Sequence, residues 1–335
     1  MTESLKDFAI LLFIFVVLFA CGGKEPEVLP GKVEGTVSIG IEVPFEEPLK
    51  EYGFMMLAAA RMKVKEVNEA RGIAGIHVEL MEWEDVCEGP GIVQKARGLA
   101  NEPGLLVLIG HLCANSLTRS RPIYESKGLP VITPAITHML ATSDDSDCMF
   151  SMIYNDVMYV ERMASYLKVS GASDAALRED GTQEGVALIY EESRWGYFSK
   201  EVFLKEARRV ELKVSEIRLY DPNRPDSMES ILDALRRSGS KRIFLATSAY
   251  STALVALTSK QIRWNPIITG SDSLLWSEMT RLAGNAAEGI ILCFPFFIEN
   301  RSEELKKFQN RFQKITKRRP SWIAAITYDA VGLGI

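Results

Sequence analysis

The sequence predicts an α/β protein in which helices cover largely parallel sheets. Short apolar runs alternate with segments of helical periodicity along most of the 335 residues, which is the pattern of repeated βα units. One unit is complete: Leu105–Ile109 and residues 129–133 are apolar runs, with a polar helical stretch between them. The length favours two domains, and a composition of 47% hydrophobic and 25% charged residues suits a globular protein with a sizeable core.

The unit from residue 105 to 137 places small and polar residues at one sheet edge. Gly110 stops the first strand, Asn115 or Ser116 can cap the following helix, and Gly128 can end it. Parallel strands end at the same edge, so the residues expected there are Ala114, Asn115, Ser116, Ala135 and Thr137. Small ligands bind at that edge in open α/β sheets, and the helix start offers backbone N–H groups to an anion such as a carboxylate.

The same patterns predict the remaining elements in order. Before the central unit, strands are expected at 35–43 and 76–83, and helices at 47–68 and 90–101. After it, the expected helices are 159–168, 198–210, 228–238, 252–261 and 302–317, and the expected strands are 185–190, 214–219, 242–247 and 266–269. Alternation of this kind indicates a parallel sheet in each domain.

The first residues are typical of an export signal. Residues 8–20 are apolar without interruption, which is shorter than the ~20 residues that span a bilayer but suits a signal-peptide core. Leu18-Phe19-Ala20-Cys21 resembles the bacterial lipobox, which would make Cys21 the lipidated first residue of the mature protein. The alternative is an uncleaved or soluble-secretory leader. We expect residues 1–21 to be a lipoprotein-type signal peptide and residues 22–34, rich in Gly and Pro, to be a flexible tether.

Several classes of function find no support in the sequence. The net charge is −5 and no large basic cluster suggests nucleic acid; the short basic run at residues 314–319 is interpreted as a solvated helix end. The sequence has no Gly-x-Ser-x-Gly, no phosphate-binding Gly-rich loop and no His-Glu-x-x-His. Its three histidines are not at metal-ligand spacing. We therefore expect that the protein is not an enzyme and holds no metal and no cofactor. An exported hydrolase would need a nucleophile with an adjacent base, and we reject this class because the sequence shows no such pair.

Three motifs in order are similar to those of the leucine/isoleucine/valine-binding protein family. They are Asp85-Val86-Cys87, Gly110-His111-Leu112-Cys113 and Thr133-Pro134-Ala135-Ile136-Thr137, within a likeness that runs from about Gly35 to Val331. The family comprises the extracytoplasmic binding proteins of branched-chain amino-acid ABC transporters. The resemblance implies a type I periplasmic-binding fold: two lobes, each a mostly parallel sheet flanked by helices, with a hinge between them.

The resemblance also implies domain boundaries and a disulfide. Lobe 1 would comprise residues 35–149 and 295–335 and lobe 2 residues 150–294, and a C-terminal completion of lobe 2 would be missing from this chain. Cys87 and Cys113 match the family's disulfide, worth about 3 kcal/mol. Cys148 and Cys293 either form a second bridge or are two buried free thiols, and we favour the thiols.

A ligand site follows from the family's pattern. A zwitterionic amino acid needs donors for its carboxylate and an acceptor for its ammonium, because an unpaired buried charge is costly. Backbone N–H groups of residues 114–116, with Thr137, would bind the carboxylate. The Ala135 carbonyl, the Thr137 hydroxyl and Asp272 would bind the ammonium, unless Asp272 is only a turn or helix-capping residue.

For the ligand side chain, the resemblance implies an apolar pocket. Its members would be Tyr52, Leu112 and Ile136 on lobe 1 and Trp195 and Tyr250 on lobe 2, with Trp322 able to approach. Tyr52 can equally be a core aromatic of its helix. Both His111 and His138 are interpreted as packing or capping residues rather than ligand contacts.

These expectations together describe an exported solute-binding protein. It would capture an amino acid with a branched-chain or similar apolar side chain by hinge closure and deliver it to the permease of an ABC importer. We expect a monomer at the periplasmic or cell-surface side, held to the membrane by lipid at Cys21. The alternative is a sensory or regulatory protein on the same fold, binding an amide or another small organic solute.

Overall fold

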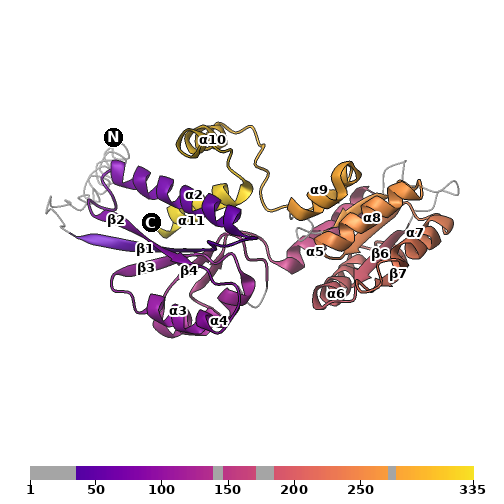
Figure 1. Cartoon of the computed structure of the whole chain (residues 1–335), viewed down its shortest axis with the longest axis horizontal. Helices are drawn as coiled ribbons and strands as arrows, with labels where there is room; N and C mark the ends of the chain where they lie inside the picture. The colour runs from indigo at the N-terminus through magenta and orange to yellow at the C-terminus, as the bar shows by residue number, and fades with distance from the viewer. Residues whose placement is uncertain (1–34, 139–145, 171–184, 271–276) are drawn as a thin grey trace, which may run out of the picture.

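Two parallel sheets with flanking helices form two lobes (Figure 1). The computed structural model describes residues 35–138, 146–170, 185–270 and 277–335. The first sheet has five strands in the order β2-β1-β3-β4-β5, and the second has five in the order β10-β9-β8-β6-β7. Every strand pair is parallel. The predicted α/β class, with a parallel sheet in each lobe, is confirmed.

The first lobe is built around β1 and β3. Its strands are β1 (Thr36–Val43), β2 (His77–Glu84), β3 (Leu105–Ile109), β4 (Val131–Thr133) and β5 (Met149–Ser151). Its helices are α2 (Lys50–Glu69), α3 (Gly91–Ala100), α4 (Ala114–Lys127), α10 (Glu303–Thr316) and α11 (Trp322–Gly334). One face of the sheet packs on α2, α10 and α11, and the other on α3 and α4. Strands covered on both faces explain the continuous apolar run at β3.

The short strand β5 is not among the predicted strands, and it lies at the boundary that the family resemblance implies between lobe 1 and lobe 2, after residue 149. It pairs with β4, with Met149 opposite Val131 and Ser151 opposite Thr133. Three residues are too few to show a period, so the local pattern does not reveal it. The chain therefore leaves the first sheet after Ser151.

The second lobe repeats the βα pattern. Its strands are β6 (Val186–Glu191), β7 (Val214–Tyr220), β8 (Arg242–Ala246), β9 (Ile267–Gly270) and β10 (Ile291–Leu292). Its helices are α5 (Asp156–Ser170), α6 (Arg194–Arg209), α7 (Ser227–Arg237), α8 (Ala249–Gln261), α9 (Ser277–Ala283) and the 3₁₀ turn η4 (Gly284–Ala287). The buried rings of Phe203 and Phe244 stack with centroids 4.1 Å apart and join α6 to β8.

Helix starts differ from the predictions where a serine caps the first turn. Ser193 accepts the N–H of Gly196 and Ser248 accepts the N–H of Ser251, so α6 and α8 begin earlier than the apolar pattern indicates. The prediction that Asn115 or Ser116 caps α4 is wrong, since the cap position is Cys113. The predicted end of α4 at Gly128 is confirmed by its left-handed φ of 63°.

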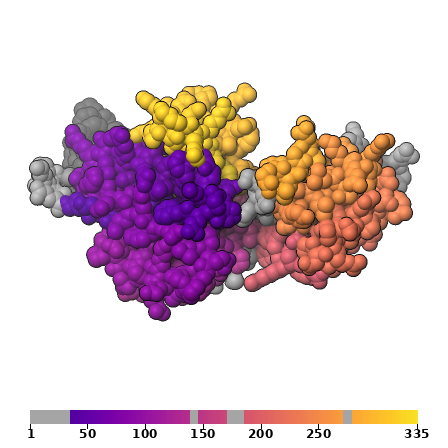
Figure 2. Space-filling model, viewed as in Figure 1, coloured from indigo at the N-terminus to yellow at the C-terminus, as the bar shows by residue number. Residues whose placement is uncertain are grey.

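The chain crosses between the lobes twice within the described residues. It passes from β5 to α5, and it returns after β10 to α10 and α11, which lie beside α2 on the first lobe (Figure 1). The space-filling view shows two masses joined by a narrower middle (Figure 2). Among the described helices, none combines the length and the apolar character needed to cross a membrane.

Candidate functional site

A cavity of about 490 Å³ lies where the lobes and the returning chain meet. The first lobe supplies most of its wall, α6 of the second lobe supplies Trp195, and the returning segment supplies Phe294, Pro295 and Trp322. The full lining is Leu49, Tyr52, Cys87, Glu88, Leu112, Cys113, Ala114, Asn115, Ala135, Ile136, Thr137, His138, Asp156, Trp195, Phe294, Pro295 and Trp322. The cavity therefore lies at the strand-end edge at which the sequence predicts a ligand.

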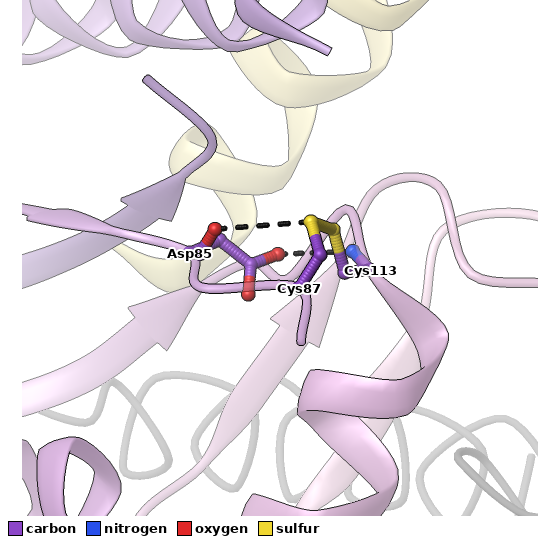
Figure 3. A group of neighbouring side chains, drawn as sticks. All are labelled: Asp85, Cys87 and Cys113. Carbon is purple, nitrogen blue, oxygen red and sulfur yellow. Dashed lines mark hydrogen bonds between the residues drawn. A yellow bond between two sulfur atoms is a disulfide. The ribbon is translucent and has the colours of Figure 1, made fainter. Parts of the chain in front are cut away.

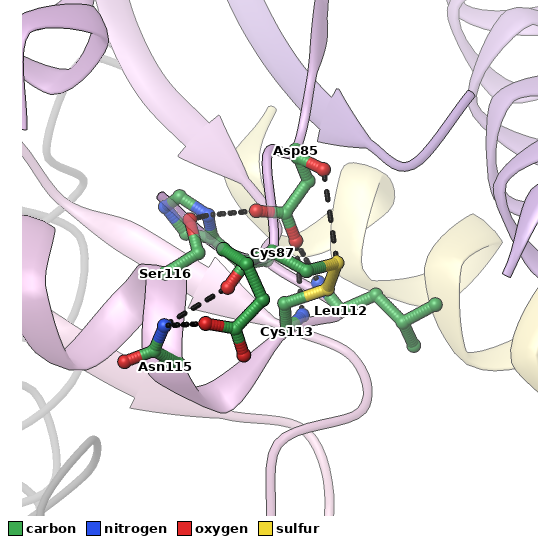
Figure 4. Close-up of a disulfide and its surroundings, with 8 residues drawn as sticks. Asp85, Cys87, Leu112, Cys113, Asn115 and Ser116 are labelled. Atoms are coloured by element: carbon green, nitrogen blue, oxygen red, sulfur yellow. Dashed lines mark hydrogen bonds and ion pairs between the residues drawn. A yellow bond between two sulfur atoms is a disulfide. The ribbon is translucent and has the colours of Figure 1, made fainter. Parts of the chain in front are cut away.

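The start of α4 forms one polar side of this cavity. The first backbone N–H groups of a helix have no carbonyl within the helix to bond, and the helix dipole makes this end positive. Ala114 and Asn115, the first two residues of α4, both line the cavity. Asn115 Nδ2 donates to the Cys87 carbonyl at 2.9 Å and to Glu88 Oε2 at 3.3 Å (Figure 4). The Asn115 side chain therefore links α4 to the loop after β2. The backbone N–H groups at the start of α4 are suited to binding an anion.

A disulfide holds the same corner together. Cys87 and Cys113 are bonded, with Cα atoms 5.2 Å apart, which confirms the pairing that the family resemblance implies (Figure 3). It joins the loop after β2 to the residue that precedes α4. No bond joins Cys148 to Cys293: Cys148 packs on the first lobe and Cys293 on the second, and both are half-buried rather than fully buried.

Asp156 forms a second polar side of the cavity. It is 8% exposed and is the first residue of α5, directly after the crossing from the first lobe. Its backbone N–H donates to the Thr137 carbonyl at 2.8 Å, and its carboxyl group is hydrogen-bonded to the Thr137 side chain. Burial raises the pKa of this carboxyl group, although Thr137 and the nearby His138 oppose the shift. A cationic ligand group would relieve this cost of burial.

Asp156 is not among the site residues that the sequence predicts. The only available signal is its position a few residues after the expected boundary between lobe 1 and lobe 2. An aspartate at a helix start is ordinarily a capping or dipole-stabilising residue, so the sequence by itself favours a structural role.

Between these polar sides the wall is apolar and largely aromatic. The side chains are Leu49, Tyr52, Leu112, Trp195, Phe294 and Trp322. The rings of Phe294 and Trp322 meet edge to face, with centroids 5.6 Å apart. Tyr52 lines the cavity and also packs on the core of the first lobe, so its packing role is compatible with a position at the cavity.

The structure brings together most of the predicted ligand residues. Those that line the cavity are Tyr52, Leu112, Ala114, Asn115, Ala135, Thr137 and Trp195. The additional Ile136 and Trp322 line it as well. Asp272 and Cys21 lie outside the described residues. Whether the lining residues bind a ligand stays a prediction.

Two predicted residues do not reach the cavity. The Ser116 side chain is 1% exposed, and its Oγ lies 3.0 Å from His111 Nδ1 behind the cavity wall. Tyr250 lies in the first turn of α8, is 55% exposed and is absent from the lining. Because α8 begins at Ala249, Tyr250 lies inside the helix, whereas the sequence predicts it in the segment before the helix.

The two central histidines have different surroundings. His111 is fully buried and is bonded to Asp85 at 2.9 Å, which agrees with the predicted packing role. His138 lines the cavity near Asp156. A set of possible metal ligands, Glu42, Asp85 and His111, is wholly buried, and its groups already bond one another.

Comparison with known proteins places this site in a family context. Residues 36–335 match the family model described as periplasmic binding protein. The leucine-, isoleucine-, valine-, threonine- and alanine-binding protein of Pseudomonas aeruginosa is 25% identical over 260 residues, which are 78% of this chain and 66% of that protein. The leucine-specific-binding protein of Salmonella typhimurium is 24% identical over 80% of this chain and 69% of its own length. The chain thus spans about two thirds of these relatives.

Solved structures agree on the fold. An ABC transporter substrate-binding protein from Desulfitobacterium hafniense, in complex with Leu, has a TM-score of 0.72 and 22% identity, with 89% of this chain and 82% of that chain covered. At this identity the likeness establishes the fold alone. The family match covers almost all of the described chain. The chain belongs to the periplasmic binding protein family.

Proposed function

We propose that this chain is an extracytoplasmic solute-binding protein that captures an amino acid with an apolar side chain and delivers it to an ABC importer. The observation that carries the proposal is the pairing of opposite polarities in one cavity. The start of α4 at Ala114 suits a carboxylate, and the buried Asp156 suits an ammonium. The aromatic and aliphatic wall between them suits an apolar side chain.

The relatives support the same ligand class. Both curated relatives carry leucine in their names, and the Desulfitobacterium hafniense protein was crystallised with Leu. The chemistry of the cavity is independent support from this chain itself. We infer leucine or a comparable apolar amino acid, including phenylalanine, as the ligand.

The proposed mechanism is closure of the two lobes around the ligand. The first lobe supplies Ala114, Asn115 and Thr137, and would bind the ligand first because it forms most of the wall. Trp195 on the second lobe would then cover the ligand side chain. We retain Asp272 as a proposed second acceptor for the ammonium, and the closed form is the species that the permease would recognise.

We further propose that the protein is an exported monomer, is anchored by lipid at Cys21 and has no enzymatic activity. The lipobox-like sequence before Cys21 supports the anchor, and the solute-binding relatives support a binding role without catalysis. Growth with radiolabelled palmitate tests the anchor. The wild-type protein should become labelled and Cys21→Ser should not; label in both proteins, or in neither, would contradict the proposal.

A thermal-shift panel tests the ligand class. Leucine, isoleucine, valine and phenylalanine should raise the melting temperature, because a ligand that binds only the folded state stabilises it by mass action. At 100 times its Kd, a ligand contributes about 2.7 kcal/mol. The amine and the acid that lack one of the two charges, isopentylamine and 4-methylpentanoate, serve as matched controls and should have little effect. A shift with benzoate or amides but not with amino acids would overturn the proposed ligand.

A further inference from the structure

A buried polar network lies directly behind the start of α4. Its members come from β1, from the loop after β2, from the segment after β3 and from α4: Glu42, Asp85, His111, Ser116 and Tyr124. Each of them is at most 3% exposed, so none is open to the cavity or to solvent. Figure 4 shows Asp85 and Ser116 beside the disulfide and the cavity residue Leu112.

Asp85 holds the cavity wall in place through its two oxygens. Oδ2 accepts the backbone N–H groups of Leu112 and Cys113, both at 2.9 Å, and Oδ1 lies 2.9 Å from His111 Nδ1 (Figures 3 and 4). Leu112 and Cys113 line the cavity, and Cys113 precedes the first turn of α4. The position of the proposed carboxylate donors therefore depends on Asp85.

The charge of Asp85 alone would oppose anion binding at this place. A buried carboxylate immediately behind the start of α4 would repel a ligand carboxylate in front of it. His111 lies on the other side of Asp85, and its Nε2 is 3.3 Å from Glu42 Oε2 and 3.2 Å from the Tyr124 hydroxyl. A protonated imidazole in this position balances the carboxylate of Asp85.

The surrounding groups favour this protonated imidazole. Burial opposes a charge on His111, but Glu42 and then Asp85 outweigh it, so the pKa of His111 is raised. Burial also opposes ionisation of Asp85, yet His111 and the hydrogen bonds to it hold the pKa of Asp85 below its ordinary value. Burial raises the pKa of Glu42. The titratable and charged groups that face His111 are Glu42 on β1, Asp85 after β2, Lys95 on α3 and Tyr124 on α4.

We propose that His111 is a positioning residue that, in its protonated form, supports the carboxylate site through Asp85 and so makes ligand affinity depend on pH without touching the ligand. The inference rests on the proposed function. Its sign follows from linkage: a bound carboxylate favours the imidazolium, so the imidazolium favours binding by the same factor. Affinity therefore falls as the pH rises through the pKa of His111 and the imidazole loses its proton.

The first test observes the imidazole itself in the full wild-type chain. The carbon-bound protons of the three histidines are followed by NMR from pH 5 to pH 9, and their signals are assigned from spectra of His77→Gln and His138→Gln. The His111 signal should titrate above the range of an ordinary histidine, and saturating L-leucine should move its titration to higher pH. A His111 signal that stays that of a neutral imidazole throughout would overturn the proposal.

The second test removes one carboxylate from the buried network and measures the affinity for L-leucine. Calorimetry with L-leucine should show a loss of about fivefold or more on the alkaline side in the wild type. Glu42→Gln removes the carboxylate that retains the proton on His111, so the alkaline loss should occur at lower pH. Glu79→Gln, an exposed carboxylate on β2, is the matched control and should behave as the wild type does.

The outcomes separate this inference from the proposed function. If the wild type binds none of leucine, isoleucine, valine and phenylalanine at any pH, the proposed function fails and the inference fails with it. If amino acids bind but the alkaline loss is absent, or is identical in folded Glu42→Gln and Glu79→Gln, the binding function stands and the role of His111 is refuted. The proposal is supported if the wild type and Glu79→Gln lose affinity over the same pH range and Glu42→Gln loses it at lower pH.

Discussion

Asp156 is the residue whose environment says most about the ligand. Its carboxyl group is 8% exposed, is bonded to Thr137 and faces the cavity at the point where the chain crosses between lobes. Burial raises its pKa although Thr137 and His138 oppose the shift, and a ligand ammonium would favour the ionised form. We therefore attribute the cation-binding half of the described site to this residue.

We expect Asp156→Asn to weaken amino-acid binding by roughly 30-fold or more, since loss of one partner of a buried charge pair typically costs at least about 2 kcal/mol. Calorimetry with L-leucine measures the change. Glu88→Gln is the matched control, because Glu88 also lines the cavity but is exposed and pairs with Asn115. Equal affinity in the wild type and Asp156→Asn would remove this residue from the site.

The carboxyl group of Asp156 also predicts an acid limb in the pH dependence of ligand binding, which is a loss of affinity at acidic pH. Below its raised pKa Asp156 is neutral and cannot pair with an ammonium, so the affinity of the wild type should increase as the pH rises through that pKa. Without ligand the sign for folding is opposite, because a carboxyl group with a raised folded pKa favours the folded state at low pH and loses that contribution as the pH rises. Asp156→Asn should lack the acid limb; an unchanged limb would assign it to another group.

At the scale of elements, capping serines decide where the helices of the second lobe begin. Ser248 caps α8 and also donates its hydroxyl to Glu191 Oε2 at 2.8 Å. The same oxygen accepts the Ser248 N–H at 3.0 Å and the Ser251 hydroxyl at 2.5 Å, and Glu191 is buried. The cap of α8 is therefore also a support for a buried carboxylate at the end of β6.

We expect Ser248→Ala to destabilise the protein by about 2 kcal/mol, because it removes a cap and one donor to a buried charge. Ser302→Ala is the matched control: Ser302 caps α10 by accepting the Leu305 N–H but supports no buried carboxylate, so its loss should cost about 1 kcal/mol. Urea unfolding followed by circular dichroism gives both values. Equal destabilisation would show that the Glu191 contact adds nothing.

At the scale of the whole molecule, the two lobes and the crossings between them would supply the means of the proposed closure. The cavity takes residues from both lobes and from the returning segment, and so its shape depends on how the lobes are placed. A ligand that binds the closed arrangement better shifts the population toward it. The lobes differ in what they offer, since the polar groups lie mainly on the first lobe and its crossover.

Saturating L-leucine should therefore reduce the radius of gyration of the protein in small-angle X-ray scattering. The reason is that bringing Trp195 onto the ligand draws the second lobe toward the first. The control is Asp156→Asn, for which the same compaction should require a leucine concentration roughly 30-fold higher. A bound protein, as judged by calorimetry, that shows no compaction would contradict closure.

The sequence by itself determined the parallel α/β class, most strands and helices and the order of the family motifs, and the resemblance that these motifs carry implied the disulfide partners. These are local or motif-level properties: β3 is recognisable from its own apolar run, and Gly128 marks a helix end by its own backbone. As members of the ligand site, it also named nine of the residues that line the cavity, including Ile136 and Trp322. Most of these residues follow strand ends, which are visible in the pattern.

Only the tertiary structure decided which side chains face one another. Asp156 and Phe294 line one cavity with the start of α4 although they come from segments far along the chain, and packing of the two lobes brings them there. Ser116 and Tyr250 do not line that cavity. The Ser116 hydroxyl is hydrogen-bonded to the buried His111, and Tyr250 lies inside α8, which begins earlier than the apolar pattern predicts. The physical reason is that the apolar periodicity of the sequence determines which face of a helix or strand is buried, whereas long-range packing determines which other segments that face contacts.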